Sequence, residues 1–107
     1  MQKTRNRFFD LAIKEAQLAG NRGEVPVGAV ITDSQTREVV ATAGNLVEQN
    51  QDPTAHAEIV VIRAACNLIG SRNLKNCDLY VTLEPCPMCA AAISLARIRR
   101  LYFGAFD

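Results

Sequence analysis

The chain has 107 residues, of which 49% are hydrophobic and 21% are charged. This length allows one domain, predicted to span residues 1–107, and the composition is that of a globular protein rather than a disordered one. Twelve Lys and Arg against eleven Asp and Glu leave a formal charge of +1. The overall charge therefore gives no argument for a polyanionic partner, and any contact with nucleic acid must depend on a local basic patch.

The amino-terminal segment and the cysteine content bear on cellular location. Asp10, Lys14 and Glu15 interrupt the apolar residues near the N-terminus, so we recognise no signal-peptide hydrophobic region. No stretch approaches the roughly 18 apolar residues of a membrane-spanning helix. We therefore expect a cytoplasmic protein with no membrane partner. In such a reducing compartment, the four cysteines are expected to be free, catalytic or metal-binding rather than paired.

The first half of the chain predicts a helix followed by an antiparallel hairpin. Apolar residues recur at three- and four-residue spacings from Phe8 to Ala19, which indicates an amphipathic helix of about four turns ending at Gly20 and Gly23. Two β-rich runs then flank a polar turn, which predicts strands joined by a loop of about five residues. The expected elements are a helix over 8–19, strands over 25–31 and 38–43, and a turn at 33–36.

The second half predicts helices alternating with strands. The expected elements are a polar loop over 46–52, a helix over 54–69 closed by Gly70, a turn over 71–76, strands over 79–83 and 101–104, and a helix over 87–97. Pro53 is expected in the first turn of the helix over 54–69. That helix has little polar face, so we expect it to be nearly buried. Strand, helix and strand in succession predict a right-handed crossover, and hence a parallel pair.

One histidine, one acid and two cysteines form the pattern that carries chemistry. Glu58 follows two residues after His56, and Cys86 and Cys89 stand three residues apart at the start of the next helix. Such thiols face the same way, and helix amides and the helix dipole favour the thiolate, so both are predicted to be metal ligands or nucleophiles. Each piece alone is weak. A Cys-x-x-Cys is also found in redox and structural zinc sites, and a lone buried histidine is most often a hydrogen-bonded core residue.

The number of ligands separates a structural from a catalytic zinc site, because a structural site fills four positions and a catalytic site leaves one for water. Cys66 lies ten residues along the helix from His56, about 15 Å at 1.5 Å per residue. Cys77 lies roughly 20 Å or more from Cys86 by strand rise. Both are interpreted as small buried hydrophobes. His56, Cys86 and Cys89 then predict a catalytic zinc, one per chain, which lowers the pKa of its water towards about 7.

Four further groups have alternative interpretations. Glu58 is interpreted as the residue that manages protons, although a helix glutamate is usually exposed to solvent. Glu84, before Pro85, is interpreted as supporting the turn through hydrogen bonds to the backbone, with catalysis as the alternative. Asn45 is either a turn residue or an amide that contacts the substrate. The densest basic cluster is Arg97, Arg99 and Arg100, which either contacts a polyanion or forms a solvated helix end.

Taken together, His-Ala-Glu, 26 residues and Pro-Cys-Pro-Met-Cys resemble the signature of the zinc-dependent cytidine/deoxycytidylate deaminase family. The blocks 24–30, 52–58, 82–89 and 103–107 are similar to the bacterial tRNA-specific adenosine deaminase branch. The resemblance implies a three-layer α/β/α sandwich with a mixed sheet. Relatives continue with another strand and a terminal helix, so the chain is expected to be short at its C-terminus and is interpreted as a fragment.

The resemblance also implies a reaction and the roles of the site residues. The reaction is hydrolytic deamination of adenosine to inosine at the wobble position of the tRNA anticodon loop, by a homodimer. His56, Cys86 and Cys89 would bind zinc, Glu58 would shuttle protons, and Asn45 would contact a base flipped into a pocket. Two alternatives stay open: a free nucleobase deaminase of the guanine deaminase type, and a non-catalytic, zinc-stabilised subunit.

Overall fold

A computed structural model describes residues 6–104 of the chain. The elements are α1 (Arg7–Asn21), β1 (Gly28–Asp33), β2 (Val39–Gly44), α2 (Val47–Asn50), α3 (Ala57–Ile69), β3 (Cys77–Val81), α4 (Pro87–Leu95) and β4 (Arg100–Phe103). Part of the predicted block 103–107 lies outside the described residues. Within them, no helix is both long enough and apolar enough to cross a lipid bilayer.

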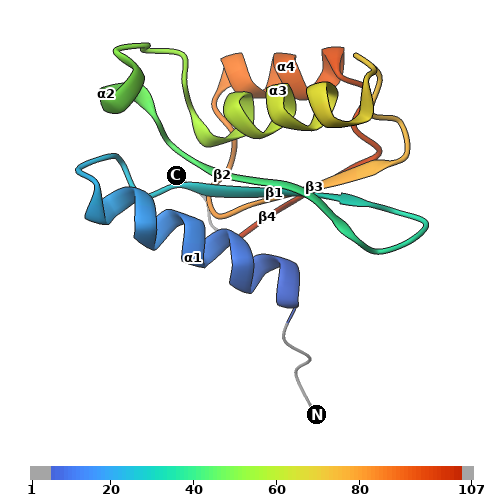
Figure 1. Ribbon diagram of the computed structural model, residues 1–107, viewed down its shortest axis with the longest axis horizontal. Coiled ribbons are helices and arrows are strands. Elements are labelled where there is room, and N and C mark those ends of the chain that lie inside the picture. The colour runs from blue at the N-terminus through green and yellow to red at the C-terminus, as the bar shows by residue number, and fades with distance from the viewer. Residues whose placement is uncertain (1–5, 105–107) are drawn as a thin grey trace.

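The four strands form one mixed sheet in the order β2-β1-β3-β4. β1 pairs antiparallel with both β2 and β3, while β3 and β4 run parallel, as the predicted crossover requires. α1 covers one face of the sheet, and α3 and α4 cover the other (Figure 1). The predicted three-layer arrangement is therefore confirmed.

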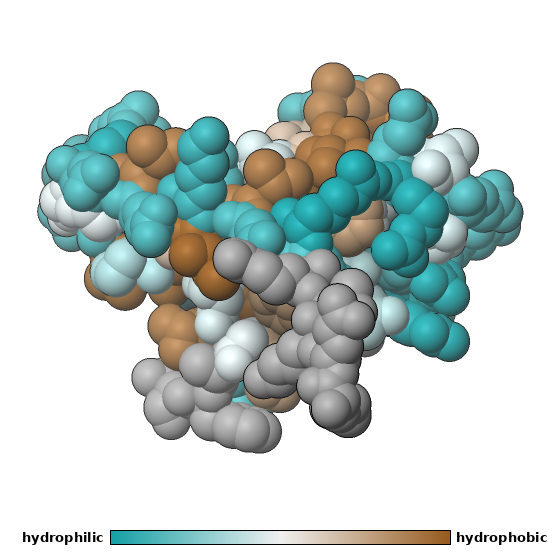
Figure 2. Space-filling view, turned by 90° about the horizontal axis from the view of Figure 1, so that it is seen from below, coloured by the Kyte–Doolittle hydropathy of each residue, from teal (hydrophilic) through white to brown (hydrophobic). Residues whose placement is uncertain are grey.

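Each face of the sheet has its own core. The side chains under α1 include Phe8, Val30 and Tyr80, and the core under α3 and α4 is larger and mostly aliphatic. α1 approaches β1 closely at Gly28, where an added Cβ would lie 2.0 Å from the carbonyl oxygen of Ala12. Figure 2, seen from the side on which α1 lies, shows hydrophilic side chains alternating with apolar ones on this face.

The starts of β1 and β3 differ from those predicted, for reasons of hydrogen bonding. β1 begins at Gly28 rather than at residue 25, because Pro26 has no N–H and the N–H of Val27 bonds to the carbonyl of Val25. β3 begins at Cys77 rather than at residue 79, because Cys77 and Asp78 still pair with β1. The polar Asp78 hid this extension of the strand from sequence analysis.

The segment between β2 and α3 contains the largest differences. α3 starts at Ala57, so Pro53 does not lie in its first turn as predicted. The Asp52 carboxylate instead accepts the N–H and hydroxyl of Thr54, which closes a turn before the helix. The predicted polar loop contains the short helix α2, whose cap comes from a distant residue described below.

The outer helices also correct two expectations. α3 was expected to be nearly buried, but Leu68 is 70% exposed, because α3 forms the outer layer of the sandwich. α4 ends at Leu95, short of the predicted residue 97. Arg97 adopts a left-handed conformation with φ of 63°, and its N–H bonds to the Ser94 carbonyl, which ends the helix.

Candidate metal centre

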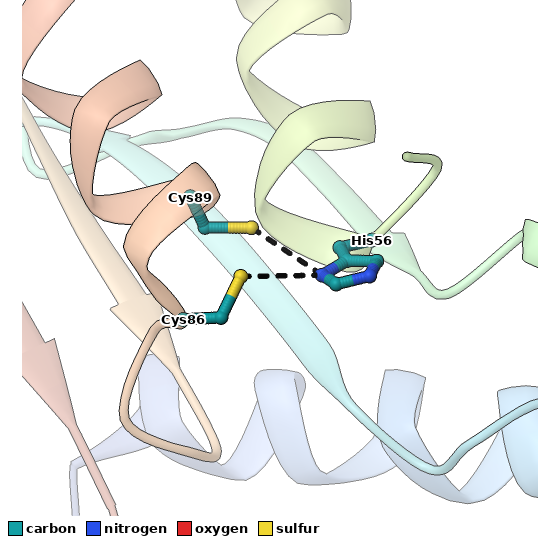
Figure 3. Close-up of side chains that lie close together, drawn as sticks. All are labelled: His56, Cys86 and Cys89. Carbon is teal, nitrogen blue, oxygen red and sulfur yellow. Dashed lines mark hydrogen bonds between the residues drawn. The ribbon is translucent and has the colours of Figure 1, made fainter. Parts of the chain in front are cut away.

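The candidate centre lies where the N-termini of α3 and α4 meet. His56 is the N-cap residue of α3 and Cys86 is the N-cap residue of α4, and both have extended backbone conformations. Neither side chain caps its own helix, so each is free to point towards the other helix. Cys89 follows Cys86 by one turn, and both sulfur atoms face the imidazole of His56 (Figure 3).

The geometry of these three side chains fits a tetrahedral zinc ion. Their ligand atoms all lie within 4.8 Å of one another. His56 Nδ1 lies 3.7 Å from Cys86 Sγ and 3.5 Å from Cys89 Sγ. Zinc bonds of about 2.3 Å to sulfur and about 2.0–2.1 Å to nitrogen, at tetrahedral angles, would separate these atoms by about 3.6 Å. The side chains therefore stand at the spacing that the ion requires, with Nδ1 as the imidazole donor.

The other two cysteines do not join this group. Cys66 packs against the core under α3 and α4, and Cys77 is buried within it. Within residues 6–104, the group that could hold a metal comprises His56, Cys86 and Cys89 alone. The interpretation as a small buried hydrophobe is confirmed for Cys77, whereas Cys66 is only half-buried. The described part of the chain offers three ligands of the usual type.

Glu58 is a buried acid at the edge of this group. Its side chain is 4% exposed, and Oε1 is a buried oxygen with no hydrogen-bond partner among the described residues. Burial raises the pKa of the Glu58 carboxyl, although its own backbone N–H, His56 and Cys89 oppose that rise. An acceptor left without a partner beside a metal-ligand set is suited to an exchangeable proton or a substrate atom.

The surroundings of Cys89 differ from the sequence-based expectation. Burial, followed by the nearby Glu58 carboxylate, raises the pKa of the Cys89 thiol rather than favouring its ionised form. Without a bound metal, the Cys89 thiol is therefore disposed to keep its proton. A bound dication reverses this balance, because a thiol that coordinates zinc loses its proton.

Asn45 makes a hydrogen bond that neither of its two interpretations predicted. Its Oδ1 accepts the N–H of Ala57 at 2.8 Å, which satisfies the first amide of α3. The side chain is 6% exposed, and its backbone N–H bonds to the Val27 carbonyl. Asn45 thus joins the end of β2 to the residue after His56. Its predicted contact with a substrate base stays a prediction.

The structure changes the interpretation of Glu84 and of the basic cluster. Glu84 is exposed, and within the described residues no hydrogen bond of its carboxylate supports the turn, so that interpretation is wrong. Arg99 donates two hydrogen bonds to Asp78, at 2.9 and 2.7 Å, and so does not belong to a free basic cluster. Arg97 and Arg100 remain exposed.

Sequence analysis missed the roles of Glu24 and Arg22, which bond to the junction between β2 and α2 and do not belong to the metal-ligand group. The Glu24 carboxylate accepts the N–H groups of Glu48 and Gln49, and Arg22 donates to the carbonyl of Asn45. These contacts join residues more than twenty positions apart. No local pattern in the sequence signals such contacts.

The fold and this centre together define a zinc-binding deaminase domain. A family model of the cytidine and deoxycytidylate deaminase zinc-binding region matches residues 2–105, and the chain belongs to this family. The family prediction made from the spacing of His56, Cys86 and Cys89 is therefore confirmed, together with its zinc cofactor.

Sequence relatives indicate which branch of the family the chain resembles. The chain is 57% identical over 103 residues to a tRNA-specific adenosine deaminase of Agrobacterium fabrum, covering 96% of this chain and 66% of that protein. It is 52% identical to the protein of that name from Bacillus subtilis, covering 94% and 61%. The chain thus spans about two thirds of the length of these relatives.

Two solved structures have the same fold. One comes from work on A-to-I editing by tRNA:A34 deaminases at the wobble position of transfer RNA, with a TM-score of 0.92 and 57% identity over 96% of this chain and 73% of that one. The other is guanine deaminase from Bacillus subtilis, with a TM-score of 0.89 and 38% identity over 97% and 66%. The predicted cytidine-deaminase-like fold is confirmed.

Proposed function

We propose that this chain catalyses the zinc-dependent hydrolytic deamination of adenosine to inosine at the wobble position of a tRNA anticodon loop. The observation that carries the chemistry is the buried, partnerless Oε1 of Glu58 beside three side chains spaced for zinc. The choice of substrate is supported by the 57% identity to a tRNA-specific adenosine deaminase. A role in tRNA modification also supports the expected cytoplasmic location.

The mechanism assigns a separate task to each residue. His56, Cys86 and Cys89 would hold zinc, which when bound acts as a Lewis acid and makes hydroxide available from water near neutral pH. Glu58 takes a proton from the attacking water and delivers it to the ring nitrogen beside the amino-bearing carbon of adenine. Glu58 then carries a second proton to the leaving group, which departs as ammonia.

Asn45 is proposed to orient the base. Its Oδ1 is already occupied by the N–H of Ala57, so the amide nitrogen is the atom left for a substrate acceptor. Because the same side chain caps the helix that begins after His56, the base would be fixed relative to the metal ligands. A flipped base needs such an edge contact in addition to stacking.

Guanine deamination is the second candidate, favoured by the 38% identity to guanine deaminase. The test incubates the zinc-loaded chain with an RNA hairpin that carries adenosine at the wobble position, and separately with guanine. We expect inosine in the hairpin and no xanthine. Xanthine alone would favour guanine deaminase, and bound zinc without either product would favour the non-catalytic subunit. Glu38→Gln, at an exposed position, serves as the control variant.

A homodimer is proposed as the working assembly. Leu68 of α3 and Met88 and Leu95 of α4 are 70%, 37% and 81% exposed, so the outer helices present large apolar side chains to solvent. Burying such side chains against a second copy would remove them from water. Sedimentation of the chain and of Leu95→Asp tests this, with a monomeric variant expected; equal sedimentation would argue against this face.

A further inference from the structure

Two loops frame the candidate centre, and one segment is hydrogen-bonded to both. The first loop leaves β2 at Asn45, and the second leaves β3 at Thr82 and leads to Cys86. The carbonyl of Val27 accepts the N–H of Asn45 at 3.2 Å. Gly28 exchanges two hydrogen bonds with Thr82, at 3.1 and 3.2 Å. The segment 24–28 therefore ties the loop that leads from Asn45 towards His56 to the loop that leads from Thr82 to Cys86.

Glu24 begins this segment and has a buried carboxylate. The side chain is 6% exposed, and its two oxygens accept the N–H groups of Glu48 at 3.1 Å and Gln49 at 2.9 Å. These are amides of the first turn of α2, whose N-cap residue, Leu46, offers no side-chain acceptor. Without Glu24 the first turn of α2 would lack an acceptor for these N–H groups.

The negative charge of Glu24 is stabilised by neighbouring groups. Burial acts to raise the pKa of this carboxyl, but the amides of Glu48 and Gln49 and the charge of Arg22 outweigh it, so the pKa is lowered. Arg22 also donates to the carbonyl oxygen of Asn45 at 3.3 Å. Glu24 and Arg22 thus hold the two sides of the junction between β2 and α2.

Asn45 lies at that junction and connects it to the start of α3. Its backbone is held by Val27 and Arg22, and its side chain caps Ala57, the residue after His56. We propose that Glu24 is a positioning residue: its carboxylate fixes α2, and α2 fixes the orientation of Asn45 relative to the metal centre. Glu24 touches none of the metal-ligand group. The effect on catalysis rests on the proposed function, whereas the effect on the loop does not.

The first test is a double-mutant cycle in the zinc-loaded chain. Glu24→Gln keeps the shape but turns an amide NH₂ towards a backbone N–H, and should lower kcat/KM by about 10- to 100-fold through misplacement of Asn45. In an Asn45→Ala background the same change should have little further effect, because Glu24 would act through Asn45. Fully additive effects would overturn the proposal. Glu38→Gln is the matched control.

The second test does not depend on turnover. Amide hydrogen exchange should accelerate in Glu24→Gln at Glu48, Gln49 and Ala57, and remain as in wild type in Glu38→Gln. Faster exchange at Glu48 and Gln49 with unchanged exchange at Ala57 would mean that the carboxylate caps α2 without positioning Asn45. If wild type deaminates neither the RNA hairpin nor guanine, the proposed function fails and this measurement alone decides the inference.

A second variant covers the case in which Glu24→Gln does not fold. Arg22 is exposed, and Arg22→Met removes both the hydrogen bond to the Asn45 carbonyl and a positive charge that stabilises the Glu24 carboxylate. It should accelerate exchange at Ala57 in the same direction, and Asn45→Ala should again abolish its additional effect on kcat/KM. Unchanged exchange and unchanged kcat/KM in Arg22→Met would contradict the proposal.

Discussion

Asp78 and Glu58 are equally hidden from water, yet their surroundings differ in kind. Asp78 in β3 is 1% exposed and receives two hydrogen bonds from Arg99. Glu58 in α3 is 4% exposed and has an oxygen with no partner among the described residues. A buried carboxylate without a partner is expensive, so proteins normally pair or neutralise it. The difference separates an acid that holds the fold together from one available for chemistry.

The largest expected effect is on catalysis at the unsatisfied acid. Glu58→Gln preserves the shape of the side chain but cannot carry protons, and should lower the deamination rate by about 10²- to 10⁴-fold while zinc content stays unchanged. Steady-state rates and metal analysis of the purified variant check this. Glu84→Gln, at an exposed position, should retain activity. If Glu58→Gln turned over normally and Glu84→Gln did not, Glu84 would be the better candidate for the acid.

The next effect is on stability at the satisfied acid. Asp78→Asn removes the charge that Arg99 binds and should lower the free energy of unfolding by about 2 kcal/mol. This figure lies below the range for fully buried pairs, because the Arg99 side chain is 39% exposed. Urea denaturation of the zinc-loaded proteins measures it. Glu58→Gln should leave the midpoint nearly unchanged, and equal losses in the two variants would remove the distinction between these acids.

Glu24 is a third buried acid, and its carboxylate is satisfied by backbone amides. Its folded-state pKa is lowered, because the amides of Glu48 and Gln49 outweigh the effect of burial. Its contribution to stability is therefore complete above the ordinary glutamate pKa and is lost as pH falls through the lowered value. Thermal midpoints between about pH 7 and pH 3 should fall less steeply in Glu24→Gln than in wild type. Identical slopes would contradict this assignment.

The features that the sequence predicted are those encoded by neighbouring residues. The spacing of His56, Cys86 and Cys89 predicted the group that the structure brings together, because each residue begins or lies in the first turn of a helix. The hairpin and the crossover also follow from local patterns of apolar residues. The start of the helix α3 was predicted wrongly, because a proline is often found in the first turn of a helix. Pro53 instead lies in a turn before α3.

The features that escaped sequence analysis depend on contacts between distant residues. In the sequence, the polar Asp78 indicates a break in a strand. In the structure it lies within β3, because Arg99, 21 positions away, binds its carboxylate. Glu24 reads as a polar residue before a strand until it is found capping α2, 24 positions further on. These two contacts form only when the folded chain brings distant segments together. The pattern of apolar residues around Asp78 or Glu24 therefore does not predict them.

Zinc is expected to receive three ligands from this chain and to take its fourth ligand from water or substrate. X-ray absorption at the zinc edge of the zinc-loaded chain measures the coordinating atoms directly. We expect two sulfur neighbours, one imidazole nitrogen and one further light atom, from Cys86, Cys89, His56 and a non-protein ligand. Three or four sulfur neighbours would contradict it, because Cys66 or Cys77 would then have closed the site.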